Sequence, residues 1–192
     1  SAFAKLEGID LEDWLIQKVQ INDALLSERS LRVRPGLDNK LLVSWNAMTA
    51  KGLLEAYRIF GEDAFLIRAL KILSWIKDVQ WDGQQLLRVN TNQQKSVAAF
   101  LEDYAHTIDA FIALYQVTTE LHWLESAKEL AEEVARNFMN AESKMCYFTS
   151  SDSNLIARKM ELNDNVIPAS NSVMARNFWK LGHYFRNDAW IY

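Results

Sequence analysis

Two adjacent acidic residues, Glu102 and Asp103, have the side chains best suited to acid–base chemistry in this sequence. Hydrolysis of a glycosidic bond needs two carboxyl groups on either side of the bond, one protonated and one ionised. Adjacent residues on a helix point about 100° apart, so these two alone do not form such a pair. We therefore expect a further carboxylate, Asp38 or Asp164, to approach from a neighbouring element. The alternative is that the two acids only stabilise the start of a helix.

Aromatic and amide side chains near these acids are candidates for ligand binding. Trp45 and Tyr104 could stack on a sugar, because a flat aromatic ring suits the apolar C–H face of a sugar ring; ordinary core packing is the alternative. Asn46 and Asn171 could bind hydroxyl groups or could equally cap helices. Together with Asp164, these residues form the expected substrate-binding set.

Other reactive residues offer weaker signals. His106 is spaced to pair with Glu102 or Asp103 on a helix, and a histidine in a local ion pair is the simpler interpretation. Cys146 is the single cysteine, and nothing in the sequence places a base beside it, so we expect it to be inert. The sequence contains no HExxH motif, glycine-rich phosphate loop or GxSxG turn, and we expect neither a metal nor a cofactor.

The elements that must position these residues are helices. Apolar residues recur every three or four positions over 44–60, 62–79, 99–117, 120–139 and 171–185, and less regularly over 9–29. Hydrophobic residues make up 49% of the 192 residues, enough for a real core, while only 2 prolines and 6 glycines are present. The composition and spacing predict an all-α fold.

The connections between the predicted helices alternate between short and long. Short turns are expected at Gly61, at 118–119 and at 186–188, whereas 80–97 and 140–169 are long. The long connections contain 86–89 and 146–149, which we expect to be short strands or extended arms.

Internal similarity indicates that the helices form repeated hairpins. Residues 54–57 and the helix after them match 112–115 and the helix after those, and residues 181–190 form a fainter copy. We expect about three hairpins. The chain ends where a further helix should begin, so 1–192 is expected to be one incomplete domain.

This alternation has a consequence for the candidate residues. In stacked hairpins, all long connections lie at one end, beside the start of each first helix. The segments 44–46, 102–104 and 170–172 occupy those starts and should therefore meet at one rim. Helix N-termini carry free N–H groups and partial positive charge, so this rim should favour anions and hydroxyl-rich ligands.

Three segments resemble a known family. They are RPGLDNK at 34–40 followed by SWN at 44–46, LEDYA at 101–105, and RK at 158–159 with Asp164 and PASNS at 168–172. In this order they are similar to segments of the spermatogenesis-associated protein 20 family. Asn39 stands where that family usually has an aspartate, and Ala169–Ser170 replaces its serine–glycine pair.

The resemblance implies part of an α/α toroid. Family members join a thioredoxin-like domain to a toroid related to six-hairpin glycosidases and sugar 2-epimerases, and the present sequence resembles part of the toroid only. It implies a glycosidase-like or epimerase-like pocket, with Glu102, Asp103 and Asp38 as catalytic candidates. The first helix of each pair should line the inside of the toroid.

Two functions remain open from the sequence. One is a carbohydrate-active or carbohydrate-binding pocket at the rim, with a sugar as the ligand. The other is a non-catalytic scaffold that docks a thioredoxin-like domain or another protein; a homodimer through an incomplete edge is a further expectation. The net charge of −4 argues against nucleic acid or an anionic membrane as a partner. A lone cysteine and no apolar run of about 20 residues favour a cytoplasmic protein.

Overall fold

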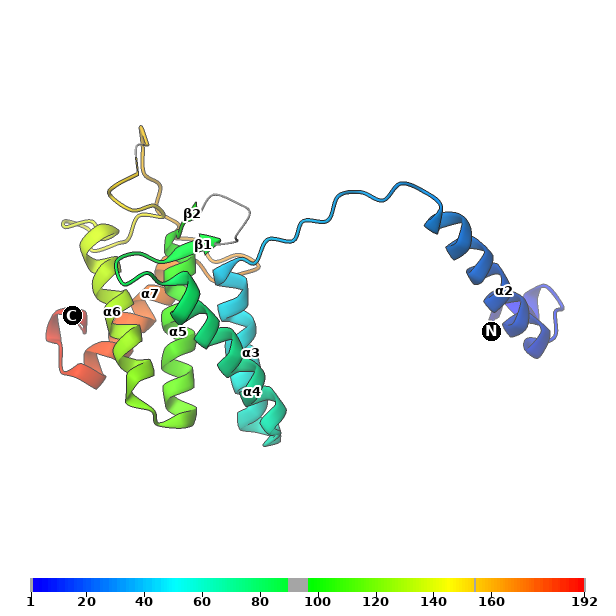
Figure 1. Cartoon of the computed structure of the whole chain (residues 1–192), viewed down its shortest axis with the longest axis horizontal. Helices are drawn as coiled ribbons and strands as arrows, with labels where there is room; N and C mark the ends of the chain where they lie inside the picture. Colours follow the sequence, from blue (N-terminus) through cyan, green and yellow to red (C-terminus); the bar gives the residue numbers. More distant parts are fainter. Residues whose placement is uncertain (1, 90–96, 154, 192) are drawn as a thin grey trace. The chain divides into compact units, whose positions relative to one another are not determined.

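The chain folds into two compact units (Figure 1). A computed structural model describes residues 2–89, 97–153 and 155–191. Contacts between Cα atoms divide the chain into Ser1–Asn39 and Lys40–Tyr192. That 1–192 is one incomplete toroid domain stays a prediction. The helices of the expected toroid all lie in the second unit.

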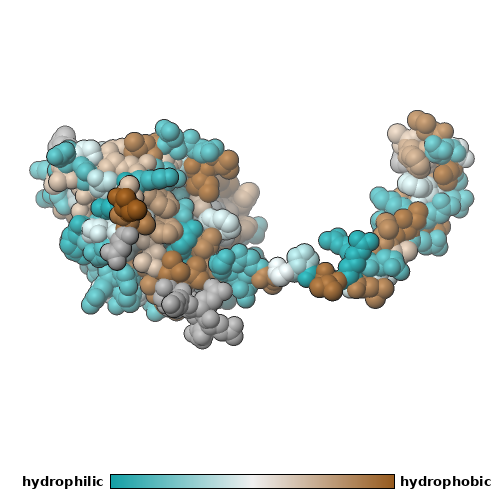
Figure 2. All heavy atoms as spheres, turned by 90° about the horizontal axis from the view of Figure 1, so that it is seen from above, coloured by the Kyte–Doolittle hydropathy of each residue, from teal (hydrophilic) through white to brown (hydrophobic). Residues whose placement is uncertain are grey.

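The first unit consists of α1 (Ala2–Leu6) and α2 (Leu11–Ser30). Asp10 caps α2, because its carboxylate accepts hydrogen bonds from the backbone N–H groups of Glu12 and Asp13 at 2.8 and 3.3 Å. Every residue of α2 is exposed or half-exposed. Brown apolar and teal polar spheres are mixed on the visible face of this unit (Figure 2). The apolar residues of α2 therefore do not form one buried stripe.

The second unit contains the predicted hairpins. Its elements are α3 (Val43–Phe60), α4 (Asp63–Trp75), the π-helical turn η1 (Ile76–Gln80), β1 (Leu87–Val89), β2 (Val97–Ala98), α5 (Leu101–Thr118), α6 (Leu121–Asn137), α7 (Ser170–Phe185) and the 3₁₀ turn η2 (Asp188–Trp190). Helices α3–α4 and α5–α6 are complete hairpins. Helix α7 begins a third, in which η2 stands where a second helix was expected to start.

Helix α5 is the centre of the unit and packs against α3, α6 and α7. Its length is almost entirely buried. On the side facing α6, Phe111 packs against Trp123 with ring centroids 5.4 Å apart. On α7, Gly182 fits closely beneath η2, since a Cβ at this position would lie 2.7 Å from the side chain of Ile191. First helices thus pack on first helices, and the second helices α4 and α6 cover their outer side.

The short turns close with left-handed residues. Gly61 after α3 has φ 70°, and its N–H donates to the carbonyl oxygen of Tyr57 at 2.8 Å, as the sequence predicted. Thr119 after α5 and Arg186 after α7 adopt the same conformation with φ 61° and 54°. The turns after α3 and α5 lie at the end of the unit opposite to β1 and β2 (Figure 1).

The long connections gather at the other end. Strand β1 pairs antiparallel with β2. The segment 146–149, expected to be a short strand or an extended arm, is an extended arm with a bridge between Met139 and Cys146. This arm also receives a hydrogen bond of 2.9 Å from the N–H of Leu101 to the carbonyl oxygen of Phe148. The arm therefore connects the end of α6 to the start of α5 within the second hairpin.

Candidate functional site

The starts of α3, α5 and α7 meet at one rim, as expected from the alternating connections. The backbone N–H of Ser44 in α3 donates to Asp103 Oδ1 in α5 at 3.0 Å. The arm at 146–148 bonds both to Leu101 at the start of α5 and to Asn171 at the start of α7. These contacts bring together three segments that lie far apart in the sequence.

Asp103 is the buried junction of this rim. Besides Ser44, it accepts a hydrogen bond from the N–H of Phe100 at 3.0 Å and an ion pair from Arg88 Nη1 at 2.9 Å. Its side chain has no exposed surface. A carboxylate that holds two helix starts and one arginine is suited to positioning, and it has no open side toward a ligand.

Glu102 is the acid of the pair that solvent reaches. Its side chain is 25% exposed and binds Arg88 Nη1 at 2.5 Å. The same guanidinium lies 5.0 Å from the centroid of the Phe100 ring. Adjacent positions on the helix thus separate the two acids, as their angular spacing requires, and Arg88 bridges them. Of the two, Glu102 is the candidate for contact with a substrate.

The two aromatic candidates have opposite environments. Trp45 is 59% exposed in the first turn of α3 and offers an open ring at the rim. Tyr104 is buried; its hydroxyl accepts a hydrogen bond from the N–H of Leu86 at 2.9 Å, and its ring packs on Phe138. Burial raises the pKa of the Tyr104 hydroxyl above its usual range. Tyr104 therefore fits the core-packing alternative, and no face of its ring is free for a sugar.

The amide candidates are engaged with backbone. Asn171 is buried, accepts from the N–H of Cys146 at 2.7 Å and donates to the carbonyl oxygens of Cys146 and Glu161 at 2.8 and 2.9 Å. Asn46 is half-buried and donates to the carbonyl oxygen of Leu42 at 2.8 Å. Asn171 thus fastens the arm to α7, and both amides have structural partners in place of a ligand hydroxyl.

Asp164 and Asp38 complete the expected set. The exposed Asp164 accepts a hydrogen bond from the N–H of Ala169 at 2.7 Å, and this bond, with one from Ser172, lowers the pKa of its carboxyl. It therefore supports the start of α7. Asp38 is exposed and belongs to the first unit, whereas every other candidate belongs to the second.

The structure also shows a cluster that sequence reasoning missed. The buried carboxylate of Asp109 in α5 binds Lys51 Nζ of α3 at 2.5 Å, and it binds Arg176 Nη2 and Lys180 Nζ of α7 at 2.8 and 3.4 Å. We call these four residues the inner-face cluster. Asp109 and Phe111 are two residues apart and point to opposite sides of α5. Since Phe111 faces α6, the cluster lies on the inner side of the first helices.

Electrostatics keep Asp109 ionised despite its burial. Burial alone would raise the pKa of this carboxyl, but the hydrogen bond from Lys51 and the charges of Lys51, Arg176 and Lys180 hold the pKa below its usual value. A signal for Asp109 was present in the sequence, as an acid flanked by the apolar positions 108 and 110–114 and seven residues after Glu102. Its three partners lie in other helices, so no local spacing identified them.

His106 lies between the rim and the inner-face cluster. It is four residues after Glu102 and three before Asp109, so all three share one stripe of α5. Burial lowers the pKa of His106, and the nearby charge of Asp109 opposes this only in part. The histidine is therefore neutral near pH 7 and can serve as a hydrogen-bonding group between the two acids.

Other reactive features give no second site. Burial raises the pKa of the Cys146 thiol to about 11, which leaves it protonated near neutral pH. Across residues 2–89, 97–153 and 155–191, no three His, Cys, Asp or Glu side chains are grouped to hold a metal ion. Among the described helices, none is both long and apolar enough to cross a bilayer.

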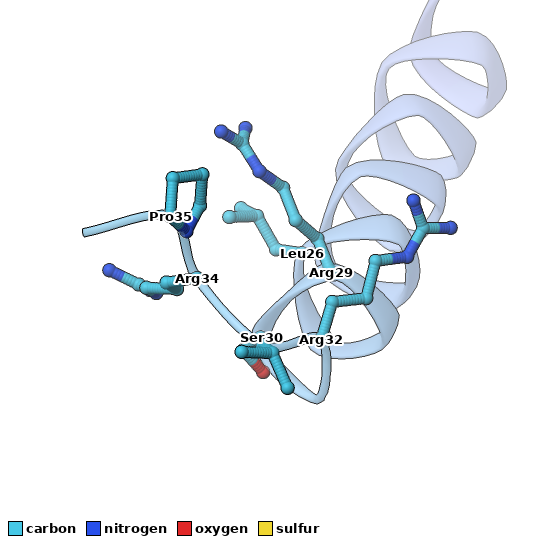
Figure 3. A pocket seen from close by; sticks show the side chains of 7 residues that line it. Leu26, Arg29, Ser30, Arg32, Arg34 and Pro35 are labelled. Carbon is cyan, nitrogen blue, oxygen red and sulfur yellow. The ribbon is translucent and has the colours of Figure 1, made fainter.

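A hollow of about 560 Å³ lies beside the end of α2, lined by Leu26, Arg29, Ser30, Arg32, Val33, Arg34 and Pro35. Figure 3 shows that the three arginine side chains point in different directions. They do not converge on one anion, so the rim and inner face of the second unit remain the better candidate.

Comparisons with known proteins agree with this geometry. No protein-family model matches the chain. Human spermatogenesis-associated protein 20 is 25% identical over 181 residues, which is 88% of this chain and 23% of the human protein. An uncharacterised protein of Caenorhabditis elegans is 28% identical over 172 residues, or 84% of this chain and 23% of that protein. The chain thus spans about a quarter of the length of these relatives.

Solved structures share the fold at low identity. A family 76 α-mannanase of Bacteroides thetaiotaomicron has a TM-score of 0.65 at 15% identity, covering 82% of this chain and 44% of the enzyme. A cellobiose 2-epimerase of Bacillus thermoamylovorans has a TM-score of 0.62 at 16% identity, covering 84% and 43%. An α-1,6-mannanase of Salegentibacter, solved as an inactive variant with two adjacent Asp→Asn substitutions and bound α-1,6-mannotriose, has a TM-score of 0.58 at 10% identity, covering 78% and 44%.

The expected resemblance is therefore confirmed: the chain is similar over 88% of its length to spermatogenesis-associated protein 20, and its second unit has the fold of a partial α/α toroid like those of the mannanases and the epimerase.

Proposed function

We propose that the rim of the second unit is a carbohydrate-binding surface. The observation that carries the proposal is the exposed ring of Trp45 at the start of α3, whose neighbour Ser44 is bonded to the Glu102–Asp103 segment of α5. An aromatic ring beside a reachable carboxylate suits a sugar, which presents both an apolar face and hydroxyl donors. The fold that this unit shares with mannanases and an epimerase supports the same ligand class.

Glu102 is the residue that we assign to contact with the sugar, and Asp103 positions it. The adjacent acids replaced in the inactive mannanase variant offer a parallel for such a pair. A glycosidase mechanism needs a second carboxylate across the bond, and here Asp103 and Asp164 are both engaged with backbone N–H groups. Binding is therefore the primary proposal. Hydrolysis would require a second carboxylate that is free to face the scissile bond.

Titration calorimetry with mono- and disaccharides tests the binding proposal. Trp45→Ala should lower affinity by about twofold to tenfold, because loss of a stacking ring removes about 0.5–1.5 kcal/mol. Trp179→Ala is the matched control, since Trp179 is 54% exposed on α7 without a rim position. Glu102→Gln should weaken binding while leaving the fold intact. Absence of heat with every sugar at millimolar concentration, or equal effects of the two tryptophan changes, would exclude the proposal.

A docking function is the second candidate, and one observation favours it. A hollow of about 560 Å³ on the outer flank of α7 has a largely apolar lining of Met139, Lys144, Ala175, Phe178, Trp179, Ala189, Trp190 and Ile191. An exposed apolar surface of this kind suits a protein partner such as a thioredoxin-like domain. If Trp179→Ala abolishes capture of a separately produced thioredoxin-like domain while Trp45→Ala does not, the docking function is supported; capture that neither change affects would exclude this surface.

A further inference from the structure

The inner-face cluster carries more positive than negative charge. Three cations, Lys51, Arg176 and Lys180, surround the single carboxylate of Asp109. One of the three charges is neutralised within the cluster, and two remain. The carboxylate is only 2% exposed, whereas the cationic side chains are 32%, 48% and 25% exposed. The positive charges are therefore the part of the cluster that a ligand can reach.

Asp109 orders these cations. Lys51 comes from α3, and Arg176 and Lys180 come from successive turns of α7, so each side chain would be mobile without a shared anchor. Binding to one buried carboxylate fixes their heads on one spot between three helices. Such preorganisation lowers the entropy lost when an anion binds. An arginine with two lysines matches the oxygen atoms of a carboxylate or phosphate group.

The position of the cluster relates it to the rim. Asp109 lies six residues beyond Asp103, which is about 9 Å along the helix axis at 1.5 Å per residue. Glu102, His106 and Asp109 lie along the same stripe of α5. If a sugar contacts Trp45 and Glu102 at the rim, an acidic substituent of that sugar could reach the cations of the inner-face cluster, which lie deeper on the inner face.

We propose that the inner-face cluster binds the anionic group of an acidic sugar, either a sugar carboxylate or a sugar phosphate. This inference rests on the proposed carbohydrate function and names the substrate class. The sugar ring lies toward the rim, and its anionic group contacts Arg176 and Lys180, with Lys51 held on Asp109. His106, neutral and between the two regions, offers a hydrogen bond to a ring hydroxyl.

The test compares four probes in titration calorimetry of the full chain: glucuronate, glucose 6-phosphate, glucose and inorganic phosphate. We expect the two acidic sugars to bind at least tenfold more tightly than glucose. Their affinity should fall as salt increases, because the contact is electrostatic. The double change Arg176→Gln and Lys180→Gln should remove this preference. Arg68→Gln, which removes an exposed cation from the outer helix α4, is the matched control and should leave it unchanged.

The outcomes separate this inference from the carbohydrate proposal. Equal binding of glucose and the acidic sugars, without salt dependence, overturns the inference and leaves sugar binding at the rim intact. Binding of inorganic phosphate as tight as that of the acidic sugars, lost in the double variant and unchanged by Trp45→Ala, keeps the anion site but overturns its assignment to sugars. The salt series uses the unaltered protein, so a double variant that fails to fold does not block the test.

Discussion

Tyr104 shows how one residue of the family-like LEDYA segment is fixed by packing. Its hydroxyl accepts a hydrogen bond from the N–H of Leu86, and both residues are buried. Tyr104→Phe leaves that N–H unpaired and should lower the free energy of unfolding by about 1–3 kcal/mol. Urea denaturation measures the change. Sugar affinity should stay within twofold of the unaltered protein, and a large loss of affinity with unchanged stability would contradict the assignment of Tyr104 to the core.

Asp109 makes stability depend on acid pH. Its folded pKa lies below its unfolded pKa, so its ionised form favours folding. That contribution is fully present above the unfolded value of about 4 and disappears as pH falls through the folded pKa. Asp109→Asn should therefore destabilise the protein at pH 7 by about 1–3 kcal/mol, since charged hydrogen bonds are lost.

The Asp109→Asn variant should also lose less stability than the unaltered protein between pH 5 and the folded pKa. Urea unfolding at pH 7, 5 and 3 gives the comparison. Asp152→Asn, at an exposed position in the long connection, is a suitable control. Parallel pH curves for the unaltered protein and the Asp109 variant would show that this carboxylate is not the source of the acid sensitivity.

At the scale of elements, the turn after α5 carries backbone strain. Thr119 is left-handed with φ 61°, a conformation that costs a β-branched residue about 1–2 kcal/mol. Thr119→Gly removes this cost, but glycine has more backbone freedom in the unfolded chain, which offsets part of the gain. The free energy of unfolding should therefore rise by about 0.5–1 kcal/mol. Thermal unfolding detects it. Gly61→Thr at the equivalent turn after α3 should have the opposite sign, and stabilisation by both changes would refute the argument.

The helices could be predicted because their signal is local. Expected ranges such as 44–60 and 171–185 differ by one residue from Val43–Phe60 and Ser170–Phe185. The range 62–79 was right in extent, although its last turn is a π-helix from Ile76 to Gln80. Apolar spacing reports which side of a helix is buried. It does not report hydrogen-bond register, and so it could not distinguish a π turn from an α turn.

The rim could be predicted and the roles at the rim could not. The order of short and long connections places the helix starts at one end, independently of the side chains found there. Whether an acid faces solvent or a neighbouring helix depends on contacts from distant segments. Asp103 is occupied by Ser44 and Arg88, and Asp109 by Lys51 and Arg176. Such partners are not encoded in local spacing, which is why the inner-face cluster was missed.

At the scale of the whole molecule, the two units should be separable. Residues 31–39, which follow α2, are exposed throughout, and the core of hairpin residues begins at Val43. We expect limited proteolysis to cut first within 31–39. The released fragment that begins near Lys40 should unfold cooperatively within a few degrees of the intact chain, because the hydrophobic core consists of residues from Val43 onward. A fragment that is molten or aggregates would show that the first unit stabilises the second.

Because the short turns and the long connections lie at opposite ends of the second unit, the two ends should tolerate sequence changes differently. Turns of two residues fix the spacing of the helices at one end, so insertions there would shift whole helices. At the other end, β1, β2 and the arm at 146–148 are joined to helices that are already held together by their own core. Sequence exchange in those segments alters the mouth and leaves the scaffold in place. Grafting loops from homologous toroids onto this end is thus a direct route to new ligand selectivity.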